Sequence, residues 1–288
     1  MTKTRVVTDS MAGLALPDSA VWSERVTVVL GQNPGMFTGP GTNTYIVGTG
    51  SRPLMLDTGQ GVDAYARVFE TACRTTRPTE ELQAIVMTHD HPDHIGGIGQ
   101  IQALLGTQPV LKMVHRGRPD DPRPTGALVD GDVVETEGAT LRAIWTPGHA
   151  ADHLCFYLEE ERALFTGDVV LGAGTTVIPD DGDLGDYLDS LRRLLALDAH
   201  VIYPAHGPAI HDPKRKIEEY IAHRELREQQ ILDCLRDGVT EVGAMVARIY
   251  VDIPEALHFA AGMSVTAHLR KLERERVVRR DGDAWFLS

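Results

Sequence analysis

This chain has few cysteines and no long apolar run. The three cysteines, Cys73, Cys155 and Cys234, lie too far apart in the 288 residues to suggest a disulfide framework or a thiolate metal site. No window approaches the roughly 20 consecutive apolar residues of a membrane span, and residues 1–10 lack the apolar core of a secretion signal. We therefore expect a soluble cytoplasmic protein with buried thiols and no membrane partner.

Positive charge is also scarce, and the shortage is uneven along the chain. The formal net charge is −13, from 28 basic and 41 acidic residues. Residues 214–288 carry 13 of each sign, so the acidic excess lies in residues 1–213, with 15 basic and 28 acidic residues. Because proteins bind phosphate backbones largely through lysine and arginine, this acidity argues against a nucleic-acid surface on the first region.

The first region contains short β-branched runs that alternate with turns rich in glycine or proline. Such runs predict strands. Apolar residues recur at helical spacing in 63–71, 98–105 and 186–197, so these stretches predict helices between the strands. Together they predict a layered α/β fold. The segment 116–125 is expected to be a mobile loop. The expected strands are Val26–Leu30, Tyr45–Val47, Leu54–Leu56, Ala84–Met87, Thr140–Trp145, Leu154–Leu158 and Ala163–Phe165.

The pattern changes after Pro213. Amphipathic helices follow one another, and Asp281 and Gly282 then stand between two apolar-alternating runs, which predicts a β-hairpin. Three helices and a hairpin indicate a small winged-helix-like module. We expect a catalytic domain at 1–213 and this module at 214–288. The predicted pieces are helices at 214–235, 241–250 and 264–275 and a hairpin at 277–287.

Six residues shortly after the run Ala84–Met87 hold three histidines and an aspartate suited to metal binding. They are His89, His91, Asp93 and His94. Neutral imidazole and carboxylate are ligands of Zn²⁺ and related cations, and an ordinary solvated polar loop seldom contains so many of them. The run therefore predicts a metal centre.

Three further ligand types follow predicted strands. His149 ends the sequence Thr-Pro-Gly-His, Asp168 ends Thr-Gly-Asp, and His206 stands in Tyr-Pro-Ala-His-Gly-Pro. One histidine beside glycine and proline is typical of a turn. Strand ends, however, can aim side chains from distant parts of a sequence at one point. Together with the first run, these residues complete a set of metal ligands.

The order of these residues resembles the metallo-β-lactamase fold superfamily over about the first 210 residues. The resemblance implies a four-layer αββα sandwich with two metals at one edge. By this resemblance, His89, His91 and His149 hold one metal, Asp93, His94 and His206 hold the other, and Asp168 bridges them.

Additional motifs resemble one subgroup, the lactamase-beta-2-like proteins, nearly from end to end. This subgroup includes an animal single-stranded-RNA endonuclease and fungal polyketide thioesterases. Ala205 departs from the pattern, which usually has glycine before the histidine, although His206 itself is retained. The motifs are 33–35, 41–45, 56–59, 146–149, 152–153, 166–168, 171–172, 174–176, 203–208 and 223–230.

The ligand set permits hydrolytic chemistry. Two divalent ions roughly 3.5 to 4 Å apart can share a bridging hydroxide and polarise the bond under attack. Histidine and carboxylate suit Zn²⁺, our expected cofactor, and tolerate Mn²⁺ or Fe²⁺. Asp93 and Asp168 are then the catalytic carboxylates. By resemblance, Asp57 orients a ligating histidine; the alternative is a turn-forming aspartate.

Other polar residues near these motifs have two interpretations. His153 and Tyr187 are candidates for donating a proton to a leaving group or for structural hydrogen bonds. Asn43 and Thr175 lie in loops that, by resemblance, border the metals, and they are candidates for contacting substrate. The histidines outside the motifs are expected at the surface: His115, His200, His211, His258 and His268.

Three classes of function compete. The first is hydrolysis of a small ester, thioester or lactone, favoured by the acidic first region and by Asp168, because superfamily members that act on β-lactams typically lack this aspartate. β-Lactam hydrolysis is then a side activity at most. A non-catalytic metal-bound binding module, the last of the three classes, is disfavoured because every ligand position is filled.

The second class is cleavage of single-stranded RNA, for which the C-terminal module offers a basic cluster. Interleaved acidic residues such as Glu273 and Glu275 also fit an ordinary solvated helix face. The same module is a candidate for pairing two chains. The cluster expected to contact RNA comprises Arg270, Lys271, Arg274 and Arg279.

Overall fold

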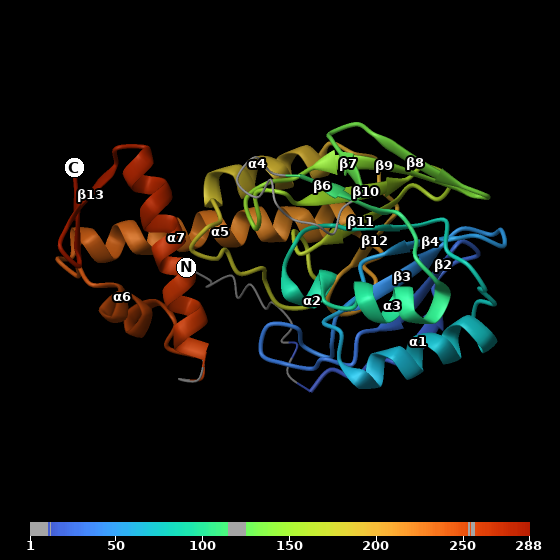
Figure 1. Ribbon diagram of the computed structural model, residues 1–288. Helices are drawn as coiled ribbons and strands as arrows, with labels where there is room; N and C mark the ends of the chain where they lie inside the picture. The colour runs from blue at the N-terminus through green and yellow to red at the C-terminus, as the bar shows by residue number, and fades with distance from the viewer. Residues whose placement is uncertain (1–10, 12, 115–124, 253, 255–256) are drawn as a thin grey trace.

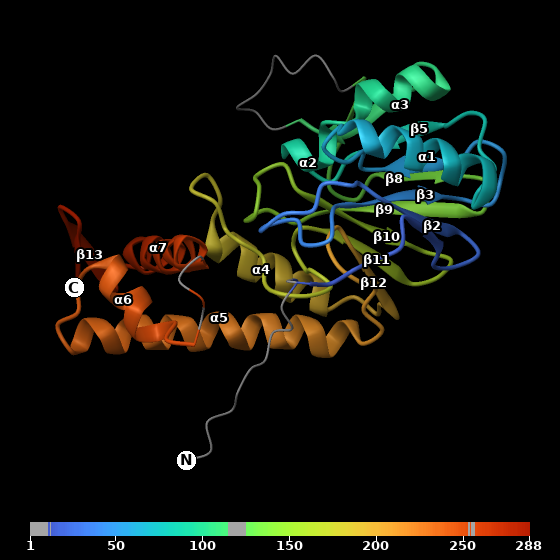
Figure 2. The same ribbon diagram turned by 90° about the horizontal axis from the view of Figure 1, so that it is seen from below.

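Two β-sheets pack face to face with helices on both outer surfaces, as the computed structural model in Figures 1 and 2 shows. The predicted four-layer αββα architecture is therefore confirmed. His115 and the predicted loop at 116–125, apart from Thr125, lie outside the described residues. The structure describes residues 11, 13–114, 125–252, 254 and 257–288.

The first sheet has seven strands in chain order, antiparallel from β1 to β4 and parallel from β4 to β7. Val28 and Tyr45 face the second sheet, while Val29 and Ile46 face the helices, so both surfaces of β2 and β3 are buried. This explains why every residue of both strands is buried, because successive side chains of a strand point to opposite faces. The strands are β1 Ser19–Val21, β2 Val26–Leu30, β3 Asn43–Val47, β4 Leu54–Leu56, β5 Ala84–Val86, β6 Val110–Met113 and β7 Gly126–Leu128.

The second sheet has five strands in the order β12-β11-β10-β9-β8. Only β11 and β12 pair in parallel. Phe156 and Phe165 point into the core between the sheets, whereas Cys155 and Leu164 pack under the helices on the outer face. The strands are β8 Val133–Thr136, β9 Ala139–Trp145, β10 Leu154–Leu158, β11 Ala163–Gly167 and β12 Val201–Pro204.

Helices α1 and α3 cover the first sheet, and α4 and α5 cover the second (Figure 2). Two begin at aspartate caps: Asp183 accepts a hydrogen bond from the backbone N–H of Asp186, and Asp212 accepts one from that of Arg215. The helices are α1 Asp63–Thr75, α2 Pro92–Ile95, α3 Ile98–Leu105, α4 Leu184–Leu195, α5 Pro213–Arg236, α6 Val242–Ile249 and α7 His258–Arg274.

The C-terminal module is a winged helix, as predicted. Its hairpin consists of β13, Val278–Asp281, and β14, Ala284–Leu287, and its core contains Trp285. Helix α5 belongs to two cores, because Tyr220 packs with the second sheet and Ile231 with the module. The boundary after residue 213 stays a prediction.

The structure also tests where several single residues lie. The three cysteines are buried, as expected. The expected surface position of His268 is wrong: its imidazole is buried between α5 and α7, with Nδ1 2.8 Å from the Ser264 carbonyl and Nε2 3.0 Å from the Arg224 carbonyl. None of the described helices is both long and apolar enough to cross a membrane.

Candidate metal centre

All the predicted metal ligands lie just beyond the end of a strand. The run Thr88–His94 follows β5, His149 follows β9, Asp168 directly follows β11, and His206 follows β12. The short helix α2 begins inside the first run and contains Asp93 and His94 in its single turn. Strand β5 belongs to the first sheet, and β9, β11 and β12 belong to the second. The ends of these strands are rigid supports for side chains that come from distant parts of the chain.

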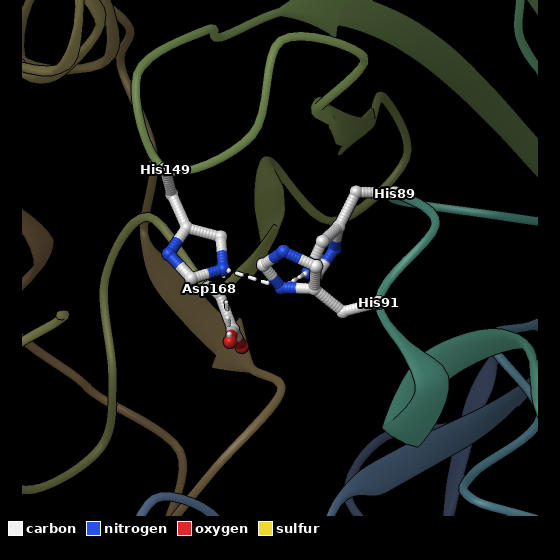
Figure 3. A group of neighbouring side chains, drawn as sticks. All are labelled: His89, His91, His149 and Asp168. Atoms are coloured by element: carbon white, nitrogen blue, oxygen red, sulfur yellow. Dashed lines mark hydrogen bonds and ion pairs between the residues drawn. The ribbon is translucent and has the colours of Figure 1, made fainter. Parts of the chain in front are cut away.

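The first group of ligands consists of three histidines and an aspartate (Figure 3). Nδ1 of His91 lies 3.0 Å from Nε2 of His89 and 3.0 Å from Nε2 of His149. Nε2 of His149 lies 3.5 Å from Oδ2 of Asp168. Ligand atoms bound at about 2.1 Å in a tetrahedron are about 3.4 Å apart, so this spacing fits one metal ion.

The second group consists of Asp93, His94 and His206. Nε2 of each histidine lies 3.4 Å from Oδ2 of Asp93. Oδ1 of Asp168 lies 3.5 Å from Nε2 of His94 and 3.2 Å from Nε2 of His206. Asp168 therefore directs one carboxylate oxygen at each group, which is the arrangement a bridging ligand needs.

Two buried atoms in this cluster are without a hydrogen-bond partner. They are Nε2 of His94 and Oδ1 of Asp168. A buried polar atom without a partner costs free energy, typically about 1 to 3 kcal/mol. The outward nitrogens are occupied instead: Nδ1 of His149 donates to the Val177 carbonyl over 2.8 Å, and Nδ1 of His94 lies 2.7 Å from Oδ2 of Asp57. The inward lone pairs are thus left for divalent cations, and the residues fit them.

The protonation equilibria of the two groups differ. Burial lowers the pKa of His149 to about 4, although Asp168 partly opposes this shift. Burial alone would lower the pKa of His206 too, but the carboxylates of Asp168 and Asp93 raise it to about 9. Burial would raise the pKa of Asp168, yet His206 and His94 hold it well below its usual range. The Asp168 carboxylate is therefore ionised at neutral pH, as a metal ligand must be.

Asp57 supports the second group from behind. Its Oδ1 accepts the backbone N–H of Thr88 over 2.8 Å, and its Oδ2 contacts the Thr88 hydroxyl as well as His94. Its φ of 56° places it in the left-handed region, where asparagine and aspartate are the commonest residues after glycine. The contact to His94 is the one predicted for a residue that orients a ligand.

Sequence reasoning missed two further supports. The Thr42 hydroxyl donates to Oδ2 of Asp93 over 3.0 Å. In the sequence, Thr42 belongs to the motif 41–45, which gave no indication of this contact. Nζ of the buried Lys112 lies 3.1 Å from Oδ2 of Asp152 and 3.8 Å from Oδ2 of Asp90. Lys112 thereby links the loop of His89 and His91 to the loop of His149. A single lysine inside the apolar strand β6 was the signal for it.

His153 and Tyr187 were candidates for donating a proton to a leaving group or for structural hydrogen bonds, and both make hydrogen bonds within the chain. His153 is fully buried, with Nδ1 3.0 Å from the Thr146 hydroxyl and Nε2 accepting the backbone N–H of Asp168 over 3.1 Å. Tyr187 is also fully buried, and its hydroxyl donates to the Val169 carbonyl over 2.7 Å. Both side chains thereby hold the Asp168 loop in place, and a proton-donating role for either stays a prediction.

Asn43 and Thr175 were predicted to contact substrate. Asn43 is buried, and its side-chain amide donates to the carbonyls of Pro204 and Gly207 over 2.9 and 2.8 Å, which fixes the loop of His206. Thr175 is partly exposed in the loop after Asp168. Substrate contact by either residue stays a prediction.

Comparison with known proteins agrees with this geometry. The sequence profile of the metallo-beta-lactamase superfamily matches residues 37–206, more than half of the chain. The chain belongs to the metallo-beta-lactamase superfamily. Members of this superfamily are in general metal-dependent hydrolases. The profile of the beta-lactamase associated winged helix domain matches residues 242–285, which lie within the C-terminal module.

Similar proteins include members of the subgroup expected from the motifs. The "Beta-lactamase-like protein 2 homolog" of Caenorhabditis elegans is 42% identical over 262 residues, covering 89% of this chain and 86% of the relative. The "Lactamase-like protein nscB" of Arthroderma gypseum is 40% identical over 293 residues, covering 94% and 90%. The resemblance therefore extends over nearly the whole metallo-beta-lactamase and winged-helix arrangement.

Solved structures show the same fold. A metallo-beta-lactamase family protein from Thermus thermophilus superposes with a TM-score of 0.78 at 25% identity, covering 93% of this chain and 100% of that one. A beta-lactamase domain protein from Burkholderia ambifaria gives a TM-score of 0.82 at 18% identity, covering 97% of both chains. The second likeness concerns the fold alone.

Proposed function

We propose that this superfamily member is a dinuclear zinc-dependent hydrolase of a small ester, thioester or lactone. The observation that supports it best is the convergence of seven histidine and aspartate side chains into two groups that share Asp168. Two divalent ions bound there would supply a water acidified toward neutral pH and polarisation of the bond to be broken. Mn²⁺ and Fe²⁺ are the alternatives to Zn²⁺.

The protein's own part in the reaction is to position and to orient. His89, His94 and His206 are buried, whereas His91, Asp93 and Asp168 are partly exposed. A substrate therefore reaches the centre from the side of these three residues. Hydrogen bonds behind the histidines fix which nitrogen faces inward, so little reorganisation is needed when substrate binds.

Two exposed apolar side chains, in a loop whose base contacts Asp93, support an acyl substrate. Met36 and Phe37 are 56% and 50% exposed at the tip of the turn that the bridge between Gly35 and Gly39 closes. The base of the same loop is attached to Asp93 through the hydroxyl of Thr42. Exposed large apolar side chains next to convergent polar groups are typical of small-molecule sites.

The basic cluster expected to bind RNA is largely used within the chain. Arg270 lies 3.1 Å from Asp180, Lys271 lies 2.8 Å from Glu228, and the Arg274 guanidinium donates to Asp183 over 2.6 Å. The guanidinium of Arg279 lies 4.9 Å from the centroid of the Phe286 ring. RNA would have to compete with these contacts, so we keep RNA cleavage as the alternative outcome of the test.

The test uses purified chain loaded with Zn²⁺, with Asp168→Ala as the control variant. We expect the wild-type chain to bind about two Zn²⁺ ions and to hydrolyse acyl thioesters. Asp168→Ala should lose the full metal content and the hydrolysis. Cleavage of single-stranded RNA by the wild-type chain and not by Asp168→Ala would favour the alternative. RNA cleavage that persists in Asp168→Ala would be contamination. Metal-loaded protein that hydrolyses neither substrate would show the substrate proposal to be wrong.

A further inference from the structure

The orientation of His149 depends on the long loop between β11 and α4. Nδ1 of His149 donates to the Val177 carbonyl over 2.8 Å. On the next residue back, the Thr176 hydroxyl donates to the Asp168 carbonyl over 2.7 Å. Residues 168–183 contain no strand or helix, so side chains from elsewhere must hold this loop. The position of Thr176 and Val177 therefore bears directly on two predicted ligands.

Arg224, in the middle of α5, holds the loop from its outer side. Its side chain is 3% exposed, and Nη2 donates to the Thr176 carbonyl. Nη1 lies 3.4 Å from the Ser264 hydroxyl of α7, and the guanidinium lies 5.4 Å from the centroid of the Tyr187 ring. One buried cation thus touches the metal loop, the catalytic core and the C-terminal module.

The hydrogen bond between Arg224 and the Thr176 carbonyl is costly to break, for an electrostatic reason. Within the described ranges, Arg224 has no carboxylate in ion-pair contact. A buried guanidinium without a counter-charge relies on hydrogen bonds to carbonyl and hydroxyl oxygens, and moving those oxygens away would leave charged donors unsatisfied. The Thr176 carbonyl is therefore held where the guanidinium needs it.

Helix α7 of the module reinforces this arrangement at two places. Nε2 of His268 lies 3.0 Å from the Arg224 carbonyl, which clamps α7 to α5. Further along α7, Arg274 donates to Oδ1 of Asp183 over 2.6 Å, and the backbone N–H of Asp183 donates to the Gly148 carbonyl over 2.7 Å. Gly148 directly precedes His149, so a second chain of contacts leads from the module to the same ligand.

We infer that the C-terminal module positions the His149 side of the metal centre, through Arg224 and Arg274. Both are positioning residues, because neither touches a ligand side chain. The inference rests on the proposed metal centre and adds a task for the winged helix within its own chain. The contacts among Asp93, His94 and His206 involve neither arginine, so the second site is affected only through the shared Asp168 and the larger effect falls on the His149 site.

The test measures metal affinity site by site in the full-length chain. Metal-free protein is titrated with Zn²⁺ against a chromophoric chelator and, separately, with Co²⁺ followed by its visible spectrum. His149→Ala and His206→Ala identify which affinity belongs to which site. Arg224→Lys keeps the charge and removes the planar fork. Arg227→Lys is the matched control, because Arg227 lies on the same helix but contacts Gln230 and the Tyr250 ring.

We expect Arg224→Lys to weaken the site identified by His149→Ala by about tenfold, the lower end of the effect of losing an outer partner of a metal ligand. The other site should weaken by a smaller factor, and the Arg227→Lys control should match wild type. Arg274→Ala, an exposed change, should weaken the same site by a smaller factor, and it decides the matter alone if Arg224→Lys does not fold. Unchanged affinities in folded variants would overturn the inference. A wild-type chain that takes up no metal would instead overturn the metal centre itself.

Discussion

The inward lone pair of His94 is set by one contact at the opposite nitrogen. Nδ1 lies 2.7 Å from Oδ2 of Asp57, which leaves Nε2 facing Asp93 and Asp168 without a hydrogen bond. His149 follows the same rule with a backbone carbonyl in place of a carboxylate. At the scale of single residues, the centre therefore depends on the partners behind the ligands as much as on the ligands.

Asp57→Asn tests this dependence. The amide keeps the size of the side chain but loses the negative charge that orients His94, so we expect affinity at the second group to fall about tenfold to a hundredfold. Metal competition against a chelator measures it, and Asp63→Asn, a change at an exposed aspartate of α1, is the matched control. Equal affinities in the two variants would refute an orienting role for Asp57.

His223 predicts a loss of stability in acid. Burial lowers its pKa to about 3, with Arg224 and Arg227 of α5 and His268 of α7 adding to the shift. The unfolded chain takes up this proton near pH 6.5 and the folded chain does not, so stability falls as the pH drops below about 6.5. Between pH 7 and pH 5 the contribution of His223 is about 2 kcal/mol.

His223→Gln removes that titration. In urea unfolding of metal-free protein, its free energy of unfolding should fall less between pH 7 and pH 5 than that of the wild type, by about 2 kcal/mol. His200→Gln, at an exposed position, serves as the control and should keep the wild-type slope. The same slope in His223→Gln as in the wild type would contradict the explanation.

At the scale of elements, the ligand loops depend on close contact between backbones. Gly148 has a φ of 126°, and a Cβ built on it would lie 2.3 Å from the backbone nitrogen of Tyr187 at the start of α4. The loop after β9 can therefore pass against α4 only because residue 148 has no side chain. This approach brings His149 to the ends of β5 and β11.

Gly148→Ala should force the two elements apart. We expect a loss of stability of about 1 to 3 kcal/mol from the strained backbone, together with loss of the metal bound on the His149 side. Thermal unfolding and metal content measure the two effects. Gly99→Ala in α3, where an added Cβ meets nothing within 4 Å, should be neutral or slightly stabilising. A Gly148→Ala protein as stable as Gly99→Ala would contradict this account.

At the scale of the whole molecule, α5 joins two cores that would otherwise be separate. Tyr220 packs with the second sheet, and its hydroxyl donates to the Gly174 carbonyl in the metal loop over 3.0 Å. About three turns further along α5, Ile231 packs with Trp285 in the winged helix. The module, the outer helices and the metal loop therefore form one mechanical unit.

Removal of metal should destabilise this unit. A ligand that binds only the folded chain at a free concentration of about 1,000 times its Kd adds about 4 kcal/mol of stability. We therefore expect a chelator to lower the midpoint of thermal unfolding of the wild-type chain by several degrees. Asp168→Ala should show a much smaller effect. A midpoint that chelator leaves unchanged would mean that the folded chain holds no tightly bound metal.

The sequence by itself determined most elements and the candidate metal ligands. Buried runs such as Leu154–Leu158 and helical spacing such as Ile98–Leu105 predicted their elements with the observed bounds, because side-chain period follows directly from backbone geometry. Short strands such as β1 and β8 escaped, since three or four half-exposed residues carry too little pattern.

Only the tertiary structure decided which polar residues are available to a substrate or partner. Tyr187 and His153 were candidate proton donors and His268 an expected surface residue, yet packing buries all three. Arg274 was expected to contact RNA, yet it pairs with Asp183, which lies 91 residues away in the chain. Burial and charge pairing depend on distances between segments remote in sequence, and local pattern holds no information about those distances. The family resemblance implied the grouping of the candidate ligands around Asp168, but only the tertiary structure gave the distances between them.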